Sequence, residues 1–213
     1  MLKKKFNYGN FHLKYDMTGE IAVGTGIVKV HDIFEPLPEF MKQADCLFID
    51  PPCSEGNFKS FYTKAEKSVR MNINFFNGRL FELIDEINPK HLFIETFKSN
   101  NETIFNRLSE RYGTSIKEFP SFYYGNKNNK CWILYAFSGE ESDFEITYID
   151  EEKAIEHVCK NLDFDCIGDL CMGKGLVGFY ANKYNKKFVG TELNEKRLAC
   201  LIEHINIGKI IIR

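Results

Sequence analysis

The stretch Asp45-Cys-Leu-Phe-Ile-Asp50-Pro-Pro-Cys53 decides how this chain of 213 residues is interpreted. Its four apolar residues, 46–49, are long enough for one buried strand of a parallel sheet. Pro51 and Pro52 end the strand, because each proline fixes its φ angle and lacks a backbone N–H group. Asp50 is therefore expected at the carboxyl end of a buried strand, where ligands bind in open α/β sheets. Taken alone, the motif fits a surface acid before a proline turn equally well.

A second chemical element lies near the C-terminus, where a strand leads through a glycine turn into a helix and a further strand. Gly173 and Gly175 allow the backbone of the turn to approach a ligand closely. Glu192 follows at the tip of the next strand, where a carboxylate can accept hydrogen bonds from ribose hydroxyls. The spacing Gly-x-Gly-x-x-Gly is met only loosely, by these two glycines and Gly178. No serine or threonine follows Lys174 as a P-loop requires.

The rest of the chain alternates strands and helices in the manner of an α/β protein. The expected strands cover residues 26–32, 46–49, 91–95, 119–124, 131–137, 165–171 and 187–192, and the fourth and fifth form a hairpin. The expected helices cover residues 75–87, 101–112, 151–162, 176–184 and 194–205, with a short helix or turn at 35–43. Residues 1–25 are expected to be irregular.

Residues 54–74 are expected to form a loop that mixes basic and aromatic side chains. The segment is too polar for a core and too long for an ordinary connection, which favours a mobile functional loop. A solvated surface loop explains the same composition. The candidate substrate-binding residues of this loop are Phe58, Lys59, Phe61, Tyr62 and Lys64.

The composition is that of one soluble globular domain, with 44% hydrophobic and 27% charged residues. A formal charge of −2 provides no global attraction to polyanions, so contact with nucleic acid would depend on local basic patches. Seven cysteines, an odd number, are expected to be reduced in a cytoplasmic protein, and none has zinc-site spacing. We expect no metal, no membrane span and no secretion signal.

The motifs resemble those of S-adenosylmethionine-dependent amino-methyltransferases. Asp50-Pro-Pro-Cys53 resembles the catalytic Asp/Asn-Pro-Pro-aromatic motif of that family, and residues 169–175 resemble its cofactor loop. Residues 188–193 resemble its ribose-binding strand, and His31-Asp32-Ile-Phe resembles its short acidic motif. The catalytic motif precedes the cofactor loop, which is the permuted β order of the family. The resemblance covers roughly residues 26–205.

The resemblance implies a Rossmann-like methyltransferase fold, circularly permuted. Its sheet is expected to be mixed but mostly parallel, with seven strands and an antiparallel hairpin. Residues 1–213 would form a single methyltransferase domain, with a catalytic half at 26–138 and a cofactor-loop half at 144–213. Only about a dozen residues separate the hairpin from the next helix, so no separate target-recognition domain is expected. Joining the halves would put the glycine-loop strand beside the Asp50 strand.

The resemblance also implies methyl transfer from S-adenosylmethionine to the exocyclic amine of a nucleic-acid base. Adenine N6 in DNA is the first choice. The alternatives are adenine N6 in RNA, cytosine N4 in DNA, and a catalytically weak cofactor-binding subunit; a dehydrogenase is more distant. The expected partners are nucleic acid and a partner subunit or second copy. The implied catalytic residues are Asp50, Pro51, Pro52 and Cys53, and the implied cofactor residues are Asp32, Asp169, Cys171, Met172, Gly173, Gly175 and Glu192.

The motifs depart from the family pattern at two cysteines. Cys53 stands where the family has an aromatic residue that stacks on the target base, and a thiol has no such face. Either an aromatic residue of the 54–74 segment compensates or activity is weak. Cys171 replaces the usual phenylalanine of the cofactor loop, which is a milder change.

Overall fold

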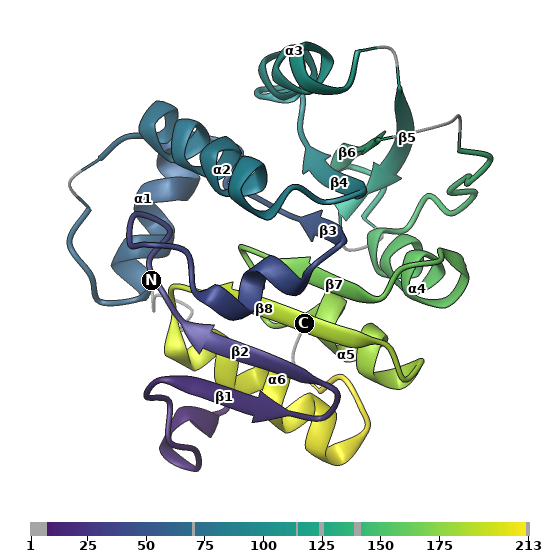
Figure 1. Ribbon diagram of the computed structural model, residues 1–213. Helices are drawn as coiled ribbons and strands as arrows, with labels where there is room; N and C mark the ends of the chain where they lie inside the picture. Colours follow the sequence, from purple (N-terminus) through teal and green to yellow (C-terminus); the bar gives the residue numbers. More distant parts are fainter. Residues whose placement is uncertain (1–7, 70, 114, 124–125, 139–141, 212–213) are drawn as a thin grey trace.

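The computed structural model describes residues 8–69, 71–113, 115–123, 126–138 and 142–211. Within these ranges the strands form one eight-stranded sheet with helices packed on both faces (Figure 1). In order across the sheet, the strands are β1 (Glu20–Val23), β2 (Gly26–Val30), β8 (Lys187–Glu192), β7 (Cys166–Asp169), β3 (Cys46–Ile49), β4 (His91–Thr96), β6 (Lys130–Phe137) and β5 (Ile116–Phe122).

The five central strands, from β2 to β4, are parallel, and the outer pairings are antiparallel. The expected mixed, mostly parallel sheet and its hairpin are confirmed. The two halves of the chain meet where β7 pairs with β3, with Cys46 opposite Ile167. The expected number of strands was wrong. Residues 20–23, expected to be irregular, form β1 through a tight hairpin in which Val23 pairs with Gly26 and Gly24 adopts a φ of +53°.

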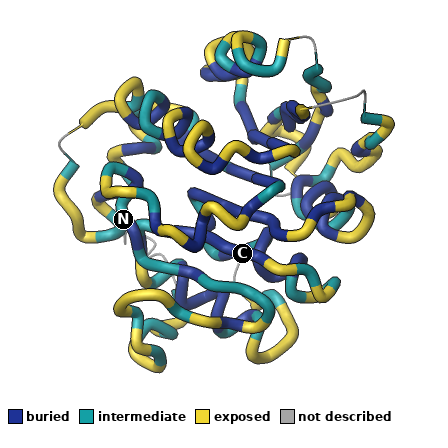
Figure 2. The backbone as a smooth tube through the Cα atoms, in the orientation of Figure 1, coloured by how far each residue is buried: buried dark blue, intermediate teal, exposed yellow. Residues whose placement is uncertain are grey.

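The helices are divided between the two faces of the sheet. Residues of α1 (Glu55–Lys64), α2 (Ile73–Ile87) and α3 (Asn101–Tyr112) pack in one hydrophobic core, and residues of α4 (Glu151–Asn161), α5 (Leu176–Lys183) and α6 (Glu195–Ile207) pack in the other. Two short 3₁₀ helices, Phe11–Leu13 and Glu39–Gln43, complete the described elements. Figure 2 shows the central strands buried and the outer faces of the helices exposed. None of the described helices is long and apolar enough to cross a membrane.

The expectation of a loop at 54–74 was wrong, because ten of these residues form α1. Ser54 caps the helix, with its hydroxyl accepting a hydrogen bond from the backbone N–H of Asn57 at 3.2 Å. Phe58 and Tyr62, four positions apart, lie on one face and are buried. The Phe58 ring packs 5.1 Å from that of Tyr62 and 5.5 Å from that of Phe76 in α2. Packing against α2 therefore stabilises the helix in this largely polar segment.

Candidate active site

A cavity lies at the carboxyl edge of the central strands. Strands β8, β7 and β3 are neighbours in the sheet, and their last residues or the next ones along the chain are Glu192, Asp169 and Asp50. All three acids line the cavity. The chain runs from β3 towards one side of the sheet and from β7 towards the other, so this position is the topological switch point where ligands bind in such sheets. The main remaining walls come from the turn 170–177 and from aromatic residues of α1, namely Phe58, Phe61 and Tyr62.

The glycine turn between β7 and α5 depends on two left-handed backbone conformations. Gly173 has a φ of +55° and Gly175 a φ of +79°. A Cβ atom on Gly175 would lie 2.5 Å from the Cβ of Leu201, so a larger residue does not fit there. A Cβ atom on Gly173 would meet nothing closer than 3.9 Å. Among the described residues, the space beside the Gly173 backbone on this side is therefore bounded only by the Cys171 carbonyl oxygen and, at 4.0 Å, by Nη1 of Arg197.

Glu192 is held by backbone groups on both of its carboxylate oxygens. Oε2 accepts a hydrogen bond from the N–H of Gly173 at 2.7 Å, and Oε1 accepts one from the N–H of Asn194 at 2.9 Å. Burial raises the pKa of Glu192, while Arg197 and these two N–H groups lower it. Each carboxylate oxygen has more than one acceptor position, so both can still accept a hydrogen bond from a ligand.

Asp50 is held by a side chain that follows β5, the strand at one edge of the sheet. Its Oδ2 accepts a hydrogen bond from the Tyr123 hydroxyl at 3.1 Å. Burial raises the pKa of Asp50 to about 6, against the lowering effects of this hydrogen bond and of the Arg197 charge. Asp50 is therefore mostly ionised at neutral pH, and it keeps acceptor capacity for a ligand N–H group.

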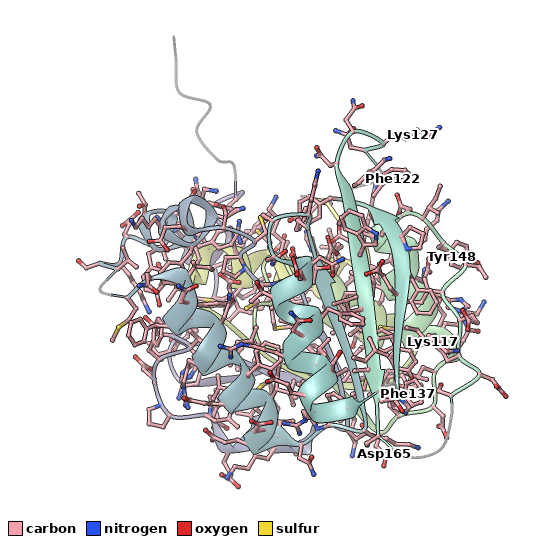
Figure 3. All side chains as sticks on the ribbon, turned by 90° about the horizontal axis from the view of Figure 1, so that it is seen from above. Lys117, Phe122, Lys127, Phe137, Tyr148 and Asp165 are labelled. Carbon is pink, nitrogen blue, oxygen red and sulfur yellow. The ribbon has the colours of Figure 1, made fainter. Side chains whose placement is uncertain are left out.

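The antiparallel hairpin brings Tyr123 to this edge. Strand β5 is antiparallel to β6, and β6 is antiparallel to β4, so β5 runs in the direction of the parallel strands. Phe122, at the carboxyl end of β5, lies at the opposite end of the hairpin from Phe137, at the carboxyl end of β6 (Figure 3). Tyr123 comes next along the chain and lines the cavity, with its ring edge-on to Phe97 at 5.3 Å.

The charged groups in the mainly apolar lining of the cavity include several acids. Burial raises the pKa of Asp169 well above its usual range, and the charges of Asp50 and Glu192 add to this effect, although Asp169 accepts a hydrogen bond from the N–H of Cys171 at 2.9 Å. Glu151, at the start of α4, is a fourth acid in the lining. Among the described residues, no three or more histidine, cysteine or acidic side chains are grouped so that they could hold a metal ion.

A fifth acid, Glu95, lies behind the cavity on β4. Ile49 pairs with Ile94, so Asp50 and Glu95 come next in register on adjacent strands. Glu95 is fully buried, and burial with the nearby charges of Asp50 and Glu151 raises its pKa well above the usual range. Burial of Glu95 beside Asp50 and Glu151 therefore favours the protonated form of its carboxyl group.

Most of the site residues expected from the sequence line this cavity. They are Asp50, Pro52, Phe58, Phe61, Tyr62, Asp169, Cys171, Met172, Gly173, Gly175 and Glu192. The remaining expected residues, which are also described in the structure, do not form its walls: Asp32, Pro51, Cys53, Lys59 and Lys64.

Four of the residues outside the walls make contacts that explain their positions. Asp32 accepts a hydrogen bond from the Tyr62 hydroxyl at 2.7 Å, so it holds one wall from behind. Lys59 pairs with Glu55 at 3.0 Å on an exposed face of α1. The Cys53 thiol lies 3.7 Å from the side-chain amide of Asn57, so Cys53 contacts the first turn of α1. Lys64 lies with its ammonium 5.5 Å from the ring centre of Phe61.

Sequence reasoning did not find five further polar or charged residues that line the cavity: His31, Tyr123, Glu151, Lys174 and Arg197. His31 and Lys174 stand beside motif residues, so their positions in the motifs were a usable signal. Tyr123 and Glu151 were expected in a strand and a helix without a role. Arg197 carried no signal, because a basic residue in the first turns of a surface helix is ordinary.

Comparison with known proteins gives structural neighbours but no sequence relatives. No family model matches the chain, and no curated protein matches it. The crystal structure of M1.HpyAVI is similar over 84% of this chain and 98% of its own, with a TM-score of 0.53 and 15% identity. The M1.HpyAVI–SAM complex is similar with a TM-score of 0.52. The cytosine-N4-specific PvuII DNA methyltransferase is similar over 84% of this chain and 86% of its own, with a TM-score of 0.54 and 12% identity. These likenesses show that the chain has the Rossmann-like methyltransferase fold that the motifs predicted.

Proposed function

We propose that this protein transfers a methyl group from S-adenosylmethionine to the exocyclic amine of a nucleic-acid base, with adenine N6 in DNA as the first choice. The observation that carries the proposal is that one cavity joins the glycine turn, Glu192 and Asp50. The fold supports it, because the neighbours include an M1.HpyAVI–SAM complex and a DNA methyltransferase.

The cavity has features that fit S-adenosylmethionine. Glu192 offers acceptor oxygens for ribose hydroxyls at a turn whose backbone is open at Gly173. Ile33, Leu170 and Leu193 provide apolar lining for a purine ring. The acidic lining suits a ligand that carries a positive sulfonium group. When bound, this group supplies an electrophilic methyl.

Asp50 would prepare the target amine. The lone pair of an exocyclic amine is delocalised into the base, which makes the amine a poor nucleophile. Asp50 and the carbonyl oxygen of Pro51 are acceptors, and hydrogen bonds to the two amine protons favour the pyramidal, nucleophilic form. Holding the amine in line with the methyl supplies much of the rate through proximity. Because a paired base is unreachable inside a duplex, the target would be flipped out or single-stranded.

Tyr123 is our candidate for the aromatic face that Cys53 lacks. Cys53 contacts Asn57 and does not form part of the cavity wall, within the part of the chain described. The Tyr123 ring lines the cavity and its hydroxyl lies against Asp50, where a base offering its amine to Asp50 would lie. Stacking on an aromatic ring contributes about 1–3 kcal/mol per base in single-strand binding proteins.

Two alternatives follow from specific observations. The PvuII neighbour is cytosine-N4-specific, which favours cytosine N4 as the second choice of target. The position of Cys53 favours a weak, cofactor-binding subunit as a further alternative, and adenine N6 in RNA remains the nucleic-acid alternative. We further propose that the described residues fold as a single domain, with no separate target-recognition domain between the hairpin and α4. A partner subunit or second copy is our proposed source of sequence specificity.

The test is methyl transfer from labelled S-adenosylmethionine to a panel of DNA and RNA, followed by digestion to nucleosides. We expect label in N6-methyladenine from DNA, and far less with the Asp50→Ala variant. Label in N4-methylcytosine, or in adenine from RNA alone, would select one of the alternatives. A protein that binds the cofactor but labels no substrate would favour the subunit role.

A further inference from the structure

Arg197 reaches into the cavity from the first turn of α6 and lies over the glycine turn. Its guanidinium carbon is 4.7 Å from the ring centre of Phe61 in α1. Its Nη1 atom is 4.0 Å from the position that a Cβ atom would take on Gly173. The guanidinium therefore lies between α1 and the open face of the glycine turn.

The charge of Arg197 acts on groups from each element around it. Burial raises the pKa values of Asp50 at the end of β3 and Glu192 on β8, and the guanidinium lowers both. Burial raises the pKa values of the Cys171 and Cys200 thiols, and the guanidinium lowers them. Burial lowers the pKa values of the Lys64 and Lys174 ammonium groups, and the guanidinium lowers them further. Arg197 is thus attracted by Asp50 and Glu192 and repelled by Lys64 and Lys174.

A ligand on the glycine turn would lie close to this guanidinium. Glu192 accepts a hydrogen bond from Gly173, so a ligand whose hydroxyls reached Glu192 would lie beside the Gly173 backbone, and Arg197 lies 4.0 Å from the Cβ position there. A sulfonium ligand would also bring a second positive charge beside the guanidinium, and two cations at contact distance repel strongly in a partly buried site. If Arg197 moves out as the ligand enters, the sulfonium group replaces the guanidinium as the positive charge near Asp50 and Glu192.

We propose that Arg197 is the resident cation of the cavity and that a sulfonium-bearing ligand takes its place. This inference rests on the proposed function for the nature of the ligand. Moving Arg197 away from the acids costs free energy, and this cost lowers the apparent affinity for the cofactor.

The first experiment needs no ligand and compares Arg197→Met with Lys196→Met. Methionine keeps an unbranched apolar chain on Phe61, and Lys196 is a matched control because it loses the same charge one position earlier. Lys196 pairs with Glu66 and does not form part of the cavity wall, as far as the described residues go.

Thermal unfolding of both variants and the parent would be followed at pH 5 and pH 8. The acids are ionised at pH 8, so we expect Arg197→Met to lower the melting temperature more at pH 8 than at pH 5, by about 2–4 °C. Lys196→Met should show no such pH dependence. Equal losses at both pH values for Arg197→Met would overturn the resident-cation role.

The second experiment measures binding of S-adenosylmethionine and of its neutral thioether product, S-adenosylhomocysteine, by calorimetry. Both ligands must displace Arg197, so Arg197→Met should bind both about tenfold more tightly than the parent. Lys196→Met should match the parent. Weaker binding of both ligands would mean that Arg197 holds them, and unchanged binding would mean that it does not overlie their site.

Tighter binding of S-adenosylmethionine alone would also overturn the exchange, because a guanidinium that stays in place repels only the charged ligand. If neither ligand binds to any of the three proteins, the proposed function and the exchange both fall. The pH comparison then still decides whether Arg197 neutralises the acids.

Discussion

Glu192 and Asp50 face the same cavity from strands on either side of β7, but they are held in different ways. Glu192 accepts two backbone N–H groups, one from the glycine turn and one from the residue that caps α6. Asp50 accepts one side-chain hydroxyl, from Tyr123, which lies 73 positions away in the sequence. One acid is fixed by the local backbone, and the other by the tertiary structure.

The difference suits two kinds of work. Backbone donors on both oxygens hold a carboxylate in one orientation, which favours a permanent contact with a bound group. Asp50 has fewer donors, and burial raises its pKa to about 6. A carboxylate with spare acceptor capacity interacts most strongly with a group that gains positive charge during a reaction. We therefore assign binding to Glu192 and chemistry to Asp50, and the following variants test that division.

Asp50→Ala should have the largest effect. If Asp50 acts mainly in the transition state, turnover should fall by on the order of 10²–10³, with little change in cofactor affinity. Single-turnover methyl transfer and calorimetry on the same preparation would measure both. A matched loss in cofactor affinity would contradict the division, because it would make Asp50 a binding residue as well.

The stability of Asp50→Ala provides the control for folding. A buried acid whose pKa is raised from 3.8 to about 6 stabilises the fold while protonated, and this contribution is lost as the pH rises through 6. Relative to the parent, the variant should therefore be more stable at pH 8 than at pH 5. Between pH 5 and pH 8 the swing should be about 1 kcal/mol, because part of the contribution is already lost below pH 5 and Asp50 is partly exposed. Denaturant unfolding at both pH values would show it.

Glu192→Gln should have the next largest effect and should act on binding. The variant loses the charged acceptor and turns an amide N–H₂ towards a backbone N–H group, so cofactor affinity should fall by roughly tenfold to a hundredfold. Glu195→Gln is the matched control, since Glu195 is exposed on the first turn of α6. Calorimetry would measure both variants. Unchanged affinity in a folded Glu192→Gln protein would remove Glu192 from the binding site.

The same contrast explains how far the sequence could predict the molecule. The C-terminal half, from β7 to α6, was predicted closely because its signals are local: an apolar run, a glycine turn and the capping residue Asn194. The backbone contacts of Glu192 belong to that local geometry. Residues 20–23 carried a local signal as well, a two-residue turn containing Gly24, but the strand is only four residues long.

The remaining features depend on contacts that no local pattern reveals. Helix α1 has few apolar positions and is held by Phe76 of α2 and by Asp32 after β2. The approach of Tyr123 to Asp50 depends on the direction of β5 in the sheet, and that of Arg197 depends on the packing of α6 beside the turn. The spacing of residues in a sequence does not reveal such tertiary contacts. The acidic residues Asp50 and Glu192 could therefore be predicted, but Tyr123 and Arg197 beside them could not.

Tyr123→Phe should have the smallest effect and is the sharpest test of the tertiary hold on Asp50. The variant keeps the ring and removes only the hydroxyl that donates to Asp50. Because that hydrogen bond lowers the pKa of Asp50, its loss should raise the pKa from about 6 by about one unit. The rate of methyl transfer, which rises with pH as Asp50 ionises, should then reach its plateau about one pH unit higher, with little change above pH 8. Tyr184→Phe is the matched control, since the Tyr184 hydroxyl donates to Glu156 at 2.7 Å and Tyr184 is not part of the cavity wall described here. A pH profile that stays in place for Tyr123→Phe while its plateau falls would show that Tyr123 acts through its ring on the base and not through Asp50.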